Sequence, residues 1–330
     1  MIGQSVSEPL AVEPVSVPRG RSHAKPVLPL RPLHRAWRRT IDDIELSRIR
    51  LPVRALPATL EGVKACQISD FHVDRDEDLE RLYAAVELIN AESPDLVFLT
   101  GDYFSGRETM TRYLPPMRDV LAGLSPRVGV FAVPGNHDHW ASVERINGAL
   151  EQAGATVLAN SSLRLSMRGE RLVIVGIDDL WTRRAEPLRA FSGVAPEDCT
   201  IVLAHNPDTA LYTHHLRPGV MLCGHTHGGV VRLPLYGSPL RSILRIGKQF
   251  YAGLNPYSDF YIYTNRGLGT FWLRIRINCR PEVSSFSLAP LGEDEEAADS
   301  SRRKTVRLVL KRKALRRLPG RTRLRKRARP

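Results

Sequence analysis

The sequence predicts an α/β fold in which a sheet is covered by helices on both faces. Short apolar runs of strand length recur along the chain, and several are separated by helix-length stretches with apolar residues on one side. The runs are apolar along nearly their whole length. This is typical of strands buried on both faces, because a half-exposed strand alternates apolar and polar residues.

The elements can be placed in order along the chain. A first strand is expected near Ile44, and six further strands are expected at 63–69, 95–100, 128–133, 171–177, 200–205 and 220–224. Amphipathic helices are expected over 77–90, 108–124 and 142–153, the last one capped by Ser142. Shorter runs at 260–265, 270–277 and 282–288 suggest antiparallel strands that complete a second sheet.

Charge divides the chain into a nearly neutral body and a basic tail. The formal net charge is +13, but 15 of the 48 Lys and Arg residues, and no acid, lie in residues 301–330, which leaves 33 basic against 35 acidic residues before them. Residues 1–43 contain many prolines and are expected to be disordered or loosely attached, residues 44–290 to form the domain, and residues 291–330 to form an acidic linker and the basic tail.

Cysteine usage and hydropathy indicate the cellular compartment in which the protein is expected. Cys66, Cys199, Cys223 and Cys279 form no CxxC pair. The first three lie in or beside apolar strand-like runs, so buried free thiols are favoured over disulfides or zinc ligation. No run reaches the ~18–20 apolar residues of a membrane helix, and no signal peptide is evident. We therefore expect a cytoplasmic protein, peripheral at the inner face of the membrane if the basic tail binds there.

Polar side chains cluster at the carboxyl ends of the predicted strands, which is the ligand-binding edge of an α/β sheet. These residues are Asp70, His72, Asp102, Asn136, His137, Asp138, His139, His205, His225 and His227. Each motif alone is ordinary turn chemistry. Together, imidazoles, carboxylates and an amide suit zinc, manganese, iron or cobalt, and two such ions can clamp a phosphoryl group.

Five motifs in order, Asp70-x-His72, Gly101-Asp102, Gly135-Asn136-His137-Asp138, His205 and Gly224-His225-x-His227, resemble those of the calcineurin-like metallophosphoesterases. The resemblance covers about residues 44–290 and implies a four-layer α/β/β/α sandwich of two mixed sheets flanked by helices. It also implies two divalent ions (Mn, Zn or Fe), with a hydroxide between them that attacks phosphorus.

The resemblance implies a role for each polar side chain. Asp70, His72 and His227 would bind one metal, Asn136, His205 and His225 the other, and Asp102 would bridge both. His137 would act on the substrate from outside the metal shell, and Asp138 would orient a ligand or the loop by hydrogen bonding. His139, Arg183 and Arg184 are candidate substrate contacts; the alternatives are loop closure for His139 and a solvated loop for the arginines.

Longer strings, including FLTGDYFSG, GNHDHW, GHTHGG and RGLGT, resemble a bacterial branch that is often anchored to membranes. That branch includes phosphodiesterases and a lipid A pathway enzyme that cleaves UDP-2,3-diacylglucosamine. Two positions depart from the protein serine/threonine phosphatases: Ser105 replaces the acid that pairs with their catalytic histidine, and Gly106 replaces a phosphate-binding arginine. These departures argue against a phosphoprotein phosphatase.

The basic tail suggests a partner. Val306, Leu310, Ala314 and Leu318 have the spacing of a short amphipathic helix, so residues 302–329 are expected to bind an anionic membrane surface. Nucleic acid is a less favoured partner, and a solvated extension is the plain alternative.

The expected function is cleavage of a phosphodiester or pyrophosphate bond in a phosphorylated small molecule, lipid-linked compound or nucleotide sugar. The alternatives are a phosphomonoesterase acting on nucleotides or phosphoproteins, and a non-catalytic membrane or nucleic-acid adaptor acting through the tail.

Overall fold

The computed structural model describes residues 43–233, 237–239, 243–270, 275–292 and 306–309, all within one compact unit, Pro32–Pro330. The predicted loose segment 1–43, apart from Asp43, lies outside the described residues. So does most of the predicted linker and tail, 291–330. The predicted domain boundaries therefore stay predictions.

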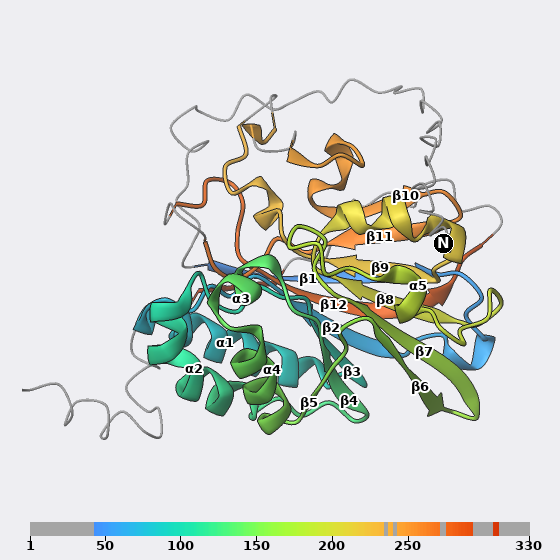
Figure 1. The fold of residues 1–330 in the computed structure, drawn as a ribbon, viewed down its shortest axis with the longest axis horizontal. Helices are drawn as coiled ribbons and strands as arrows, with labels where there is room; N and C mark the ends of the chain where they lie inside the picture. The colour runs from blue at the N-terminus through green and yellow to red at the C-terminus, as the bar shows by residue number, and fades with distance from the viewer. Residues whose placement is uncertain (1–42, 234–236, 240–242, 271–274, 293–305, 310–330) are drawn as a thin grey trace, which may run out of the picture. The chain divides into compact units, whose positions relative to one another are not determined.

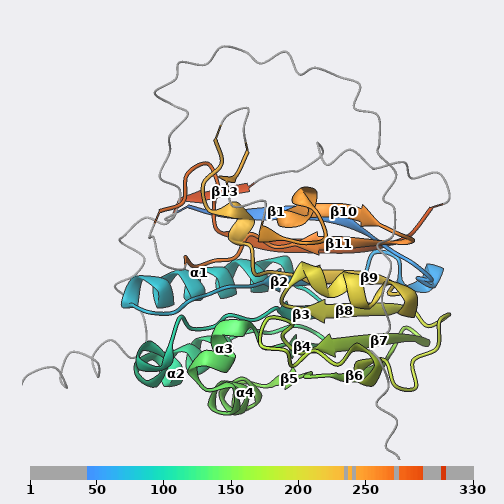
Figure 2. The same cartoon turned by 45° about the horizontal axis from the view of Figure 1, so that its top comes forward.

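The described chain forms two mixed sheets (Figures 1 and 2). The strands of the first sheet are, in spatial order, β13 (Val306–Val309), β1 (Asp43–Val53), β12 (Glu282–Pro290), β2 (Lys64–Ile68), β3 (Leu96–Leu99), β4 (Gly129–Ala132) and β5 (Ala155–Val157). β2 to β5 run parallel to one another, as β1 does to β12, whereas β12 runs antiparallel to β2 and β13 antiparallel to β1.

The strands of the second sheet are, in order, β10 (Gly253–Tyr257), β11 (Phe260–Thr264), β9 (Val220–Cys223), β8 (Thr200–Ala204), β7 (Glu170–Ile177) and β6 (Ser161–Met167). Its four central strands are parallel, and antiparallel pairs add β10 and β6 at the edges. The carboxyl ends of these central strands form one edge of the sheet.

Helices cover the outer face of the first sheet, as Figure 1 shows. They are α1 (Asp76–Glu92), α2 (Arg107–Leu121), α3 (Asn136–Ala141) and α4 (Val143–Gln152). Apolar residues such as Leu82 of α1 and Met117 of α2 form one buried core with Leu99 of β3. Three acids in the first turn of α1 suit the positive end of the helix dipole, and Ser93 ends that helix in the left-handed conformation.

A second core fills the space between the two sheets, where Phe98 and Phe131 of the first sheet pack with Ile201 and Leu222 of the second. A third core covers the outer face of the second sheet. There the helices are short: α5 (Pro187–Ala190) and the 3₁₀ turns Pro207–Tyr212 and Lys248–Tyr251. The predicted four-layer α/β/β/α sandwich is confirmed, with a thin fourth layer.

The predicted helices and the six predicted central strands are found to within a few residues of their bounds. Ser142 does occupy the N-cap position of α4, but its side chain makes no capping hydrogen bond. The four cysteines are buried free thiols, as predicted, and burial raises the pKa of Cys66 and of Cys199 to about 12.

The last third of the chain differs from the prediction. Residues 260–264 do lie in the second sheet and pair antiparallel with β10, but they run parallel to β9 on the other side. The segment 282–288 also forms a strand, but in the first sheet rather than the second. Residues 271–274, within the strand predicted at 270–277, lie outside the described residues. Val306–Val309 forms β13 instead of the start of a basic helix, and the rest of that predicted helix lies outside the described residues.

Candidate metal centre

The seven predicted metal ligands lie in the segments that follow five strands, and Asn136 is the first residue of α3. Asp70 and His72 follow β2, Asp102 follows β3, Asn136 follows β4, His205 follows β8, and His225 and His227 follow β9. All seven side chains are buried. The carboxyl ends of strands from both sheets therefore bring together residues that are up to 157 positions apart in the sequence, from Asp70 to His227.

Three overlapping groups of side chains place their metal-binding atoms within 4.8 Å of one another. They are Asp70 with His72 and His227, Asp102 with His205 and His225, and His72 with Asp102 and His137. The first two contain residues of the two predicted ligand sets. Asn136 belongs to the second predicted set, and its Oδ1 lies 3.1 Å from Nδ1 of His225.

Asp102 lies between the two sets. Its Oδ2 is 3.1 Å from Nε2 of His205 and 3.7 Å from Nε2 of His72. On the far side of His72, Nε2 of His227 is 3.2 Å from Nε2 of His72 and 3.4 Å from Oδ1 of Asp70. The donor atoms thus run from Asp70 to His205 with the Asp102 carboxylate in the middle.

The donor chemistry fits divalent metal ions. Nδ1 of His205 lies 2.7 Å from the carbonyl oxygen of Thr100, and Nδ1 of His72 lies 3.0 Å from Oγ of Ser105. Each oxygen can accept a hydrogen bond from Nδ1–H, which keeps the proton on Nδ1 and leaves the Nε2 lone pair free to bind a metal. Nε2 of His225 is buried without a hydrogen-bond partner, and Nε2 of His205 lies beside Oδ2 of Asp102. A metal ion would satisfy such atoms.

The histidines also favour the neutral form that ligates metals. Burial lowers the pKa of His72 to about 4 and that of His225 to about 3, and it lowers the pKa of His227 well below its usual value. His205 differs, because the Asp102 carboxylate outweighs the effect of burial and raises the pKa of His205 to about 10. A cation bound beside Asp102 would compete with that proton.

The backbone around the site is strained. Five of the seven ligands, Asp70, His72, Asp102, His225 and His227, have φ between 44° and 72°, a region that non-glycine residues seldom adopt. Glycines allow close approach, since a Cβ on Gly135 would collide with the Asp102 carboxylate and one on Gly224 with the Asp70 carboxylate. At these two positions only a glycine lets the backbone pass so close to the carboxylates.

Asp138 orders the loops around Asp102. Its Oδ2 accepts hydrogen bonds from the N–H groups of Asp102 and Gly135, both at 2.8 Å, and its Oδ1 accepts from the N–H of Tyr103 at 2.9 Å. Burial, together with the charge of Asp102, raises the pKa of the Asp138 carboxyl to about 7. This contact set agrees with the predicted orienting role.

His137 lies beside the metal-binding atoms at the start of α3. Its backbone N–H donates to Oδ1 of Asp102 at 2.9 Å, and its ring centroid is 4.9 Å from that of His72. Its Nδ1 lies 3.0 Å from the carbonyl oxygen of Ser105, an acceptor that fixes the proton on Nδ1.

The three predicted substrate contacts, His139, Arg183 and Arg184, differ in their surroundings from the candidate metal ligands. Nε2 of His139 lies 2.7 Å from Oδ1 of Asp178, which favours the loop-closing alternative. Arg183 and Arg184 are exposed in the loop after β7, and neither belongs to the three metal-binding groups. Their contact with substrate stays a prediction.

Two residues that form hydrogen bonds around the candidate metal centre, Asp74 and Arg276, were not predicted from the sequence. The Asp74 carboxylate accepts a 2.5 Å hydrogen bond from the Ser105 hydroxyl, which in turn contacts His72. Arg276 is fully buried, and its Nη2 donates to the carbonyl oxygens of Arg266 at 2.7 Å and Gly269 at 2.6 Å and lies 3.4 Å from Nδ1 of His227. No local pattern marks either residue, because each acts through a distant loop.

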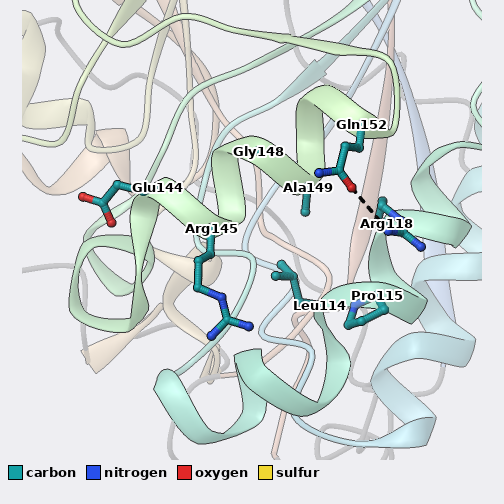
Figure 3. A pocket seen from close by; sticks show the side chains of 8 residues that line it. All are labelled: Leu114, Pro115, Arg118, Glu144, Arg145, Gly148, Ala149 and Gln152. Carbon is teal, nitrogen blue, oxygen red and sulfur yellow. Dashed lines mark hydrogen bonds between the residues drawn. The ribbon is translucent and has the colours of Figure 1, made fainter.

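A hollow elsewhere on the molecule has no connection to these residues. It lies between α2 and α4 and is lined by Leu114, Pro115 and Arg118 on one side and by Glu144, Arg145 and Gln152 among others on the other (Figure 3). Arg118 and Gln152 hydrogen bond across it at 3.3 Å. None of its lining residues belongs to the candidate metal centre.

Comparison with known proteins identifies the family of the chain. Residues 63–229 match the calcineurin-like phosphoesterase family. Phosphodiesterase YaeI of Escherichia coli strain K12 is 36% identical over 224 residues, which cover 67% of this chain and 80% of that protein. UDP-2,3-diacylglucosamine pyrophosphatase LpxG of Chlamydia trachomatis is 28% identical over 280 residues, 68% of this chain and 83% of that protein.

Among solved structures, a 5′-nucleotidase precursor from Thermus thermophilus aligns with a TM-score of 0.43 and 16% identity over 69% of this chain and 55% of that one. The family match and the relatives establish that the chain belongs to the calcineurin-like phosphoesterase family and is a metal-dependent hydrolase. Within the described part of the chain, the helices are too short or too polar to cross a membrane.

Proposed function

We propose that this protein hydrolyses a phosphodiester or pyrophosphate bond with two divalent ions, Mn, Zn or Fe. Asp70, His72 and His227 would hold one ion, Asn136, His205 and His225 the other, and Asp102 would contact both. The observation that carries this proposal is the position of Asp102 Oδ2 between Nε2 of His72 and Nε2 of His205.

Bound divalent ions supply Lewis-acid stabilisation of phosphoryl oxygens and activation of water. In the metal-free chain the pKa of the buried Asp102 carboxyl lies below its usual value, because protonated His205 outweighs the opposing effect of burial, and a bound cation would take over that role. The N–H of His137 also holds Oδ1 of Asp102 in place.

His137 would serve the substrate directly. Because the Ser105 carbonyl accepts from Nδ1, Nε2 is the nitrogen that would face a phosphate. There it can hydrogen bond a phosphoryl oxygen or, when protonated, donate a proton to the leaving oxygen. Its position beside His72 supports a role next to the ions rather than at a distance.

The relatives support the choice of bond. One is named a phosphodiesterase and another a UDP-2,3-diacylglucosamine pyrophosphatase. We propose a phosphorylated small molecule, a lipid-linked compound or a nucleotide sugar as the substrate, and a cytoplasmic protein whose residues 302–329 bind the anionic inner face of a membrane.

The test is metal-dependent hydrolysis of bis-p-nitrophenyl phosphate and p-nitrophenyl phosphate after chelation and reloading with manganese or zinc. We expect the diester to be preferred, Asp102→Asn to lose both metal and turnover, and His137→Ala to lose turnover while retaining metal. Preference for the monoester would instead identify a phosphomonoesterase. Turnover that survives chelation, or that survives in Asp102→Asn, would refute the proposal.

Removal of residues 310–330 separates an enzyme from an adaptor. This truncation spares β13, which pairs with β1 through Val306–Val309. An enzyme retains hydrolysis of the soluble diester and loses only binding to anionic vesicles, whereas an adaptor shows no turnover before or after the truncation.

A further inference from the structure

Two tryptophans flank the candidate metal centre. Trp140 of α3 has its ring centroid 4.6 Å from that of His137, and Trp181, in the loop after β7, has its centroid 4.2 Å from that of His225. One therefore lies beside the residue proposed to act on the substrate, and the other beside a proposed metal ligand. Trp140 follows β4 of the first sheet and Trp181 follows β7 of the second, so they approach the centre from separate parts of the fold.

Both indoles are only half-buried: Trp140 is 56% exposed and Trp181 is 50% exposed. These are the two tryptophans within the described residues. Tryptophan side chains are usually well buried, because they carry a large apolar surface. The chain thus leaves two large apolar surfaces in contact with water next to its most polar cluster.

The helix and the loop that carry the tryptophans are held in place. Nε2 of His139, which precedes Trp140 in α3, lies 2.7 Å from Oδ1 of Asp178, three residues before Trp181, so this contact joins α3 to the loop after β7. Oδ1 of Asn160 accepts from the N–H groups of Asp178 at 3.1 Å and Glu186 at 2.9 Å, which fixes both ends of the loop after β7.

Within that loop, the buried carboxylate of Asp179 accepts from the N–H of Thr182 at 2.6 Å. Trp181 is therefore positioned before any ligand arrives. A surface ordered in this way loses little conformational freedom on binding.

We propose that Trp140 and Trp181 form an apolar subsite that binds a nonpolar group attached to the reacting phosphate. This inference rests on the proposed function, which brings the phosphate to the metal centre, and it narrows the substrate to phosphate esters or anhydrides with apolar surface a few bonds from phosphorus. A planar ring and a hydrocarbon chain share this chemistry.

The test compares three phosphonates with the same metal-binding head group: methylphosphonate, phenylphosphonate and octylphosphonate. Calorimetric binding to the manganese-loaded full chain should be about tenfold tighter for at least one of the larger compounds than for methylphosphonate, the size expected of a good aromatic contact. A gain for phenyl alone identifies a planar ring, and a gain for octyl alone identifies a hydrocarbon chain.

The variants decide whether the tryptophans cause the gain. Trp140→Ala/Trp181→Ala should reduce it to about twofold or less, whereas Trp140→Phe/Trp181→Phe, which retains aromatic surface, should keep most of it. Val128→Ala is the matched control, since Val128 is also exposed, at 44%, but precedes β4 at the opposite end from His137. Equal binding of all three phosphonates, or a gain that survives the double alanine variant, overturns the subsite.

The same compounds used as inhibitors of bis-p-nitrophenyl phosphate hydrolysis separate the two proposals. Selective binding without any hydrolysis would leave the subsite intact and contradict the proposed function. Metal-dependent hydrolysis with no selectivity among the phosphonates would support the proposed function and contradict the subsite.

Discussion

Ser105 holds His137 through its backbone and His72 through its side chain. The Ser105 carbonyl oxygen lies 3.0 Å from Nδ1 of His137, while its Oγ lies 3.0 Å from Nδ1 of His72 and donates to Asp74. An acid is expected at this position in the protein serine/threonine phosphatases, from which this sequence departs here. In this chain a main-chain carbonyl orients His137 instead, and the Asp74 carboxylate supports the proposed metal ligand His72 through the Ser105 hydroxyl.

Ser105→Ala should therefore lower the affinity for metal and leave the orientation of His137 unchanged. The variant removes the link from Asp74 to His72 but retains the carbonyl, so we expect metal affinity to fall about tenfold or more, as for other groups that orient metal-bound histidines. Competition with a chromophoric chelator measures this change. Ser105→Thr retains a hydroxyl and should bind metal much as the native protein does.

The pH profile of the metal-saturated Ser105→Ala variant provides the second readout. Since His137 keeps its acceptor, the profile should match that of the native protein. Unchanged metal affinity would show that the Ser105 side chain does not support metal binding through His72. A shifted profile at metal saturation would show that this side chain also influences His137.

Asp138→Asn should destabilise the fold. The carboxylate accepts from three backbone N–H groups, and an amide in its place would turn an NH₂ group toward at least one of them. We expect a loss of about 1–3 kcal/mol in the free energy of unfolding, the cost of leaving a buried donor unsatisfied. Urea denaturation of the metal-free protein measures it.

Asp119→Asn is the control for that change, because its carboxylate is 66% exposed and pairs only with the neighbouring side chain of Arg118. Its unfolding midpoint should stay at the native value. If both variants unfold at the same urea concentration, the hydrogen bonds of Asp138 do not contribute to stability as described.

Arg276→Met should loosen the loop that carries Gly267 and Gly269. The guanidinium donates to three carbonyl oxygens of this loop, Arg266, Gly267 and Gly269, and methionine can replace its volume but none of these bonds. We expect faster amide hydrogen exchange at residues 266–270 and a lower melting temperature, with Arg276→Lys intermediate. Exchange that stays at the native rate in Arg276→Met would contradict this role.

The convergence of the candidate ligands could be predicted because each follows closely after a strand, and topology decides which edge of the sheet it reaches, whereas their assignment to two ions rests on the resemblance to the calcineurin-like metallophosphoesterases. β12 shows why the positions of some other elements could not be predicted from the sequence. Its polar residues Glu282, Ser284 and Ser285 are typical of an edge strand, yet the strand lies inside the first sheet. Partners from distant segments satisfy them: Arg266 for Glu282, Tyr263 for Ser284 and Glu92 for Ser285. Such pairings leave no local signal.

The same limit applies to Asp74 and to the two tryptophans. Asp74 contributes only because the loop after β3 brings Ser105 back to it, and Trp140 and Trp181 meet the centre only when the two sheets stack. In the sequence, each is an ordinary residue in a loop or short helix.

The buried pair Glu282–Arg266 should make stability depend on pH. Arg266 Nη2 donates to Glu282 Oε1 at 2.9 Å, and although burial opposes ionisation, this partner lowers the pKa of the Glu282 carboxyl from 4.5 to about 2. Because the folded-state pKa lies below the unfolded one, the stabilisation is complete above about pH 4.5 and is lost as pH falls toward 2.

Glu282→Gln removes that contribution. At pH 7 it should cost about 3 kcal/mol, since it takes one of two carboxylates from a buried guanidinium. The difference between native and variant proteins in urea denaturation should stay constant from pH 7 to pH 5 and shrink at pH 4 and pH 3. Glu61→Gln, which alters an exposed pair with Arg50 at 3.6 Å, should show no such trend. A difference for Glu282→Gln that is independent of pH would mean that the carboxylate charge does not stabilise the fold.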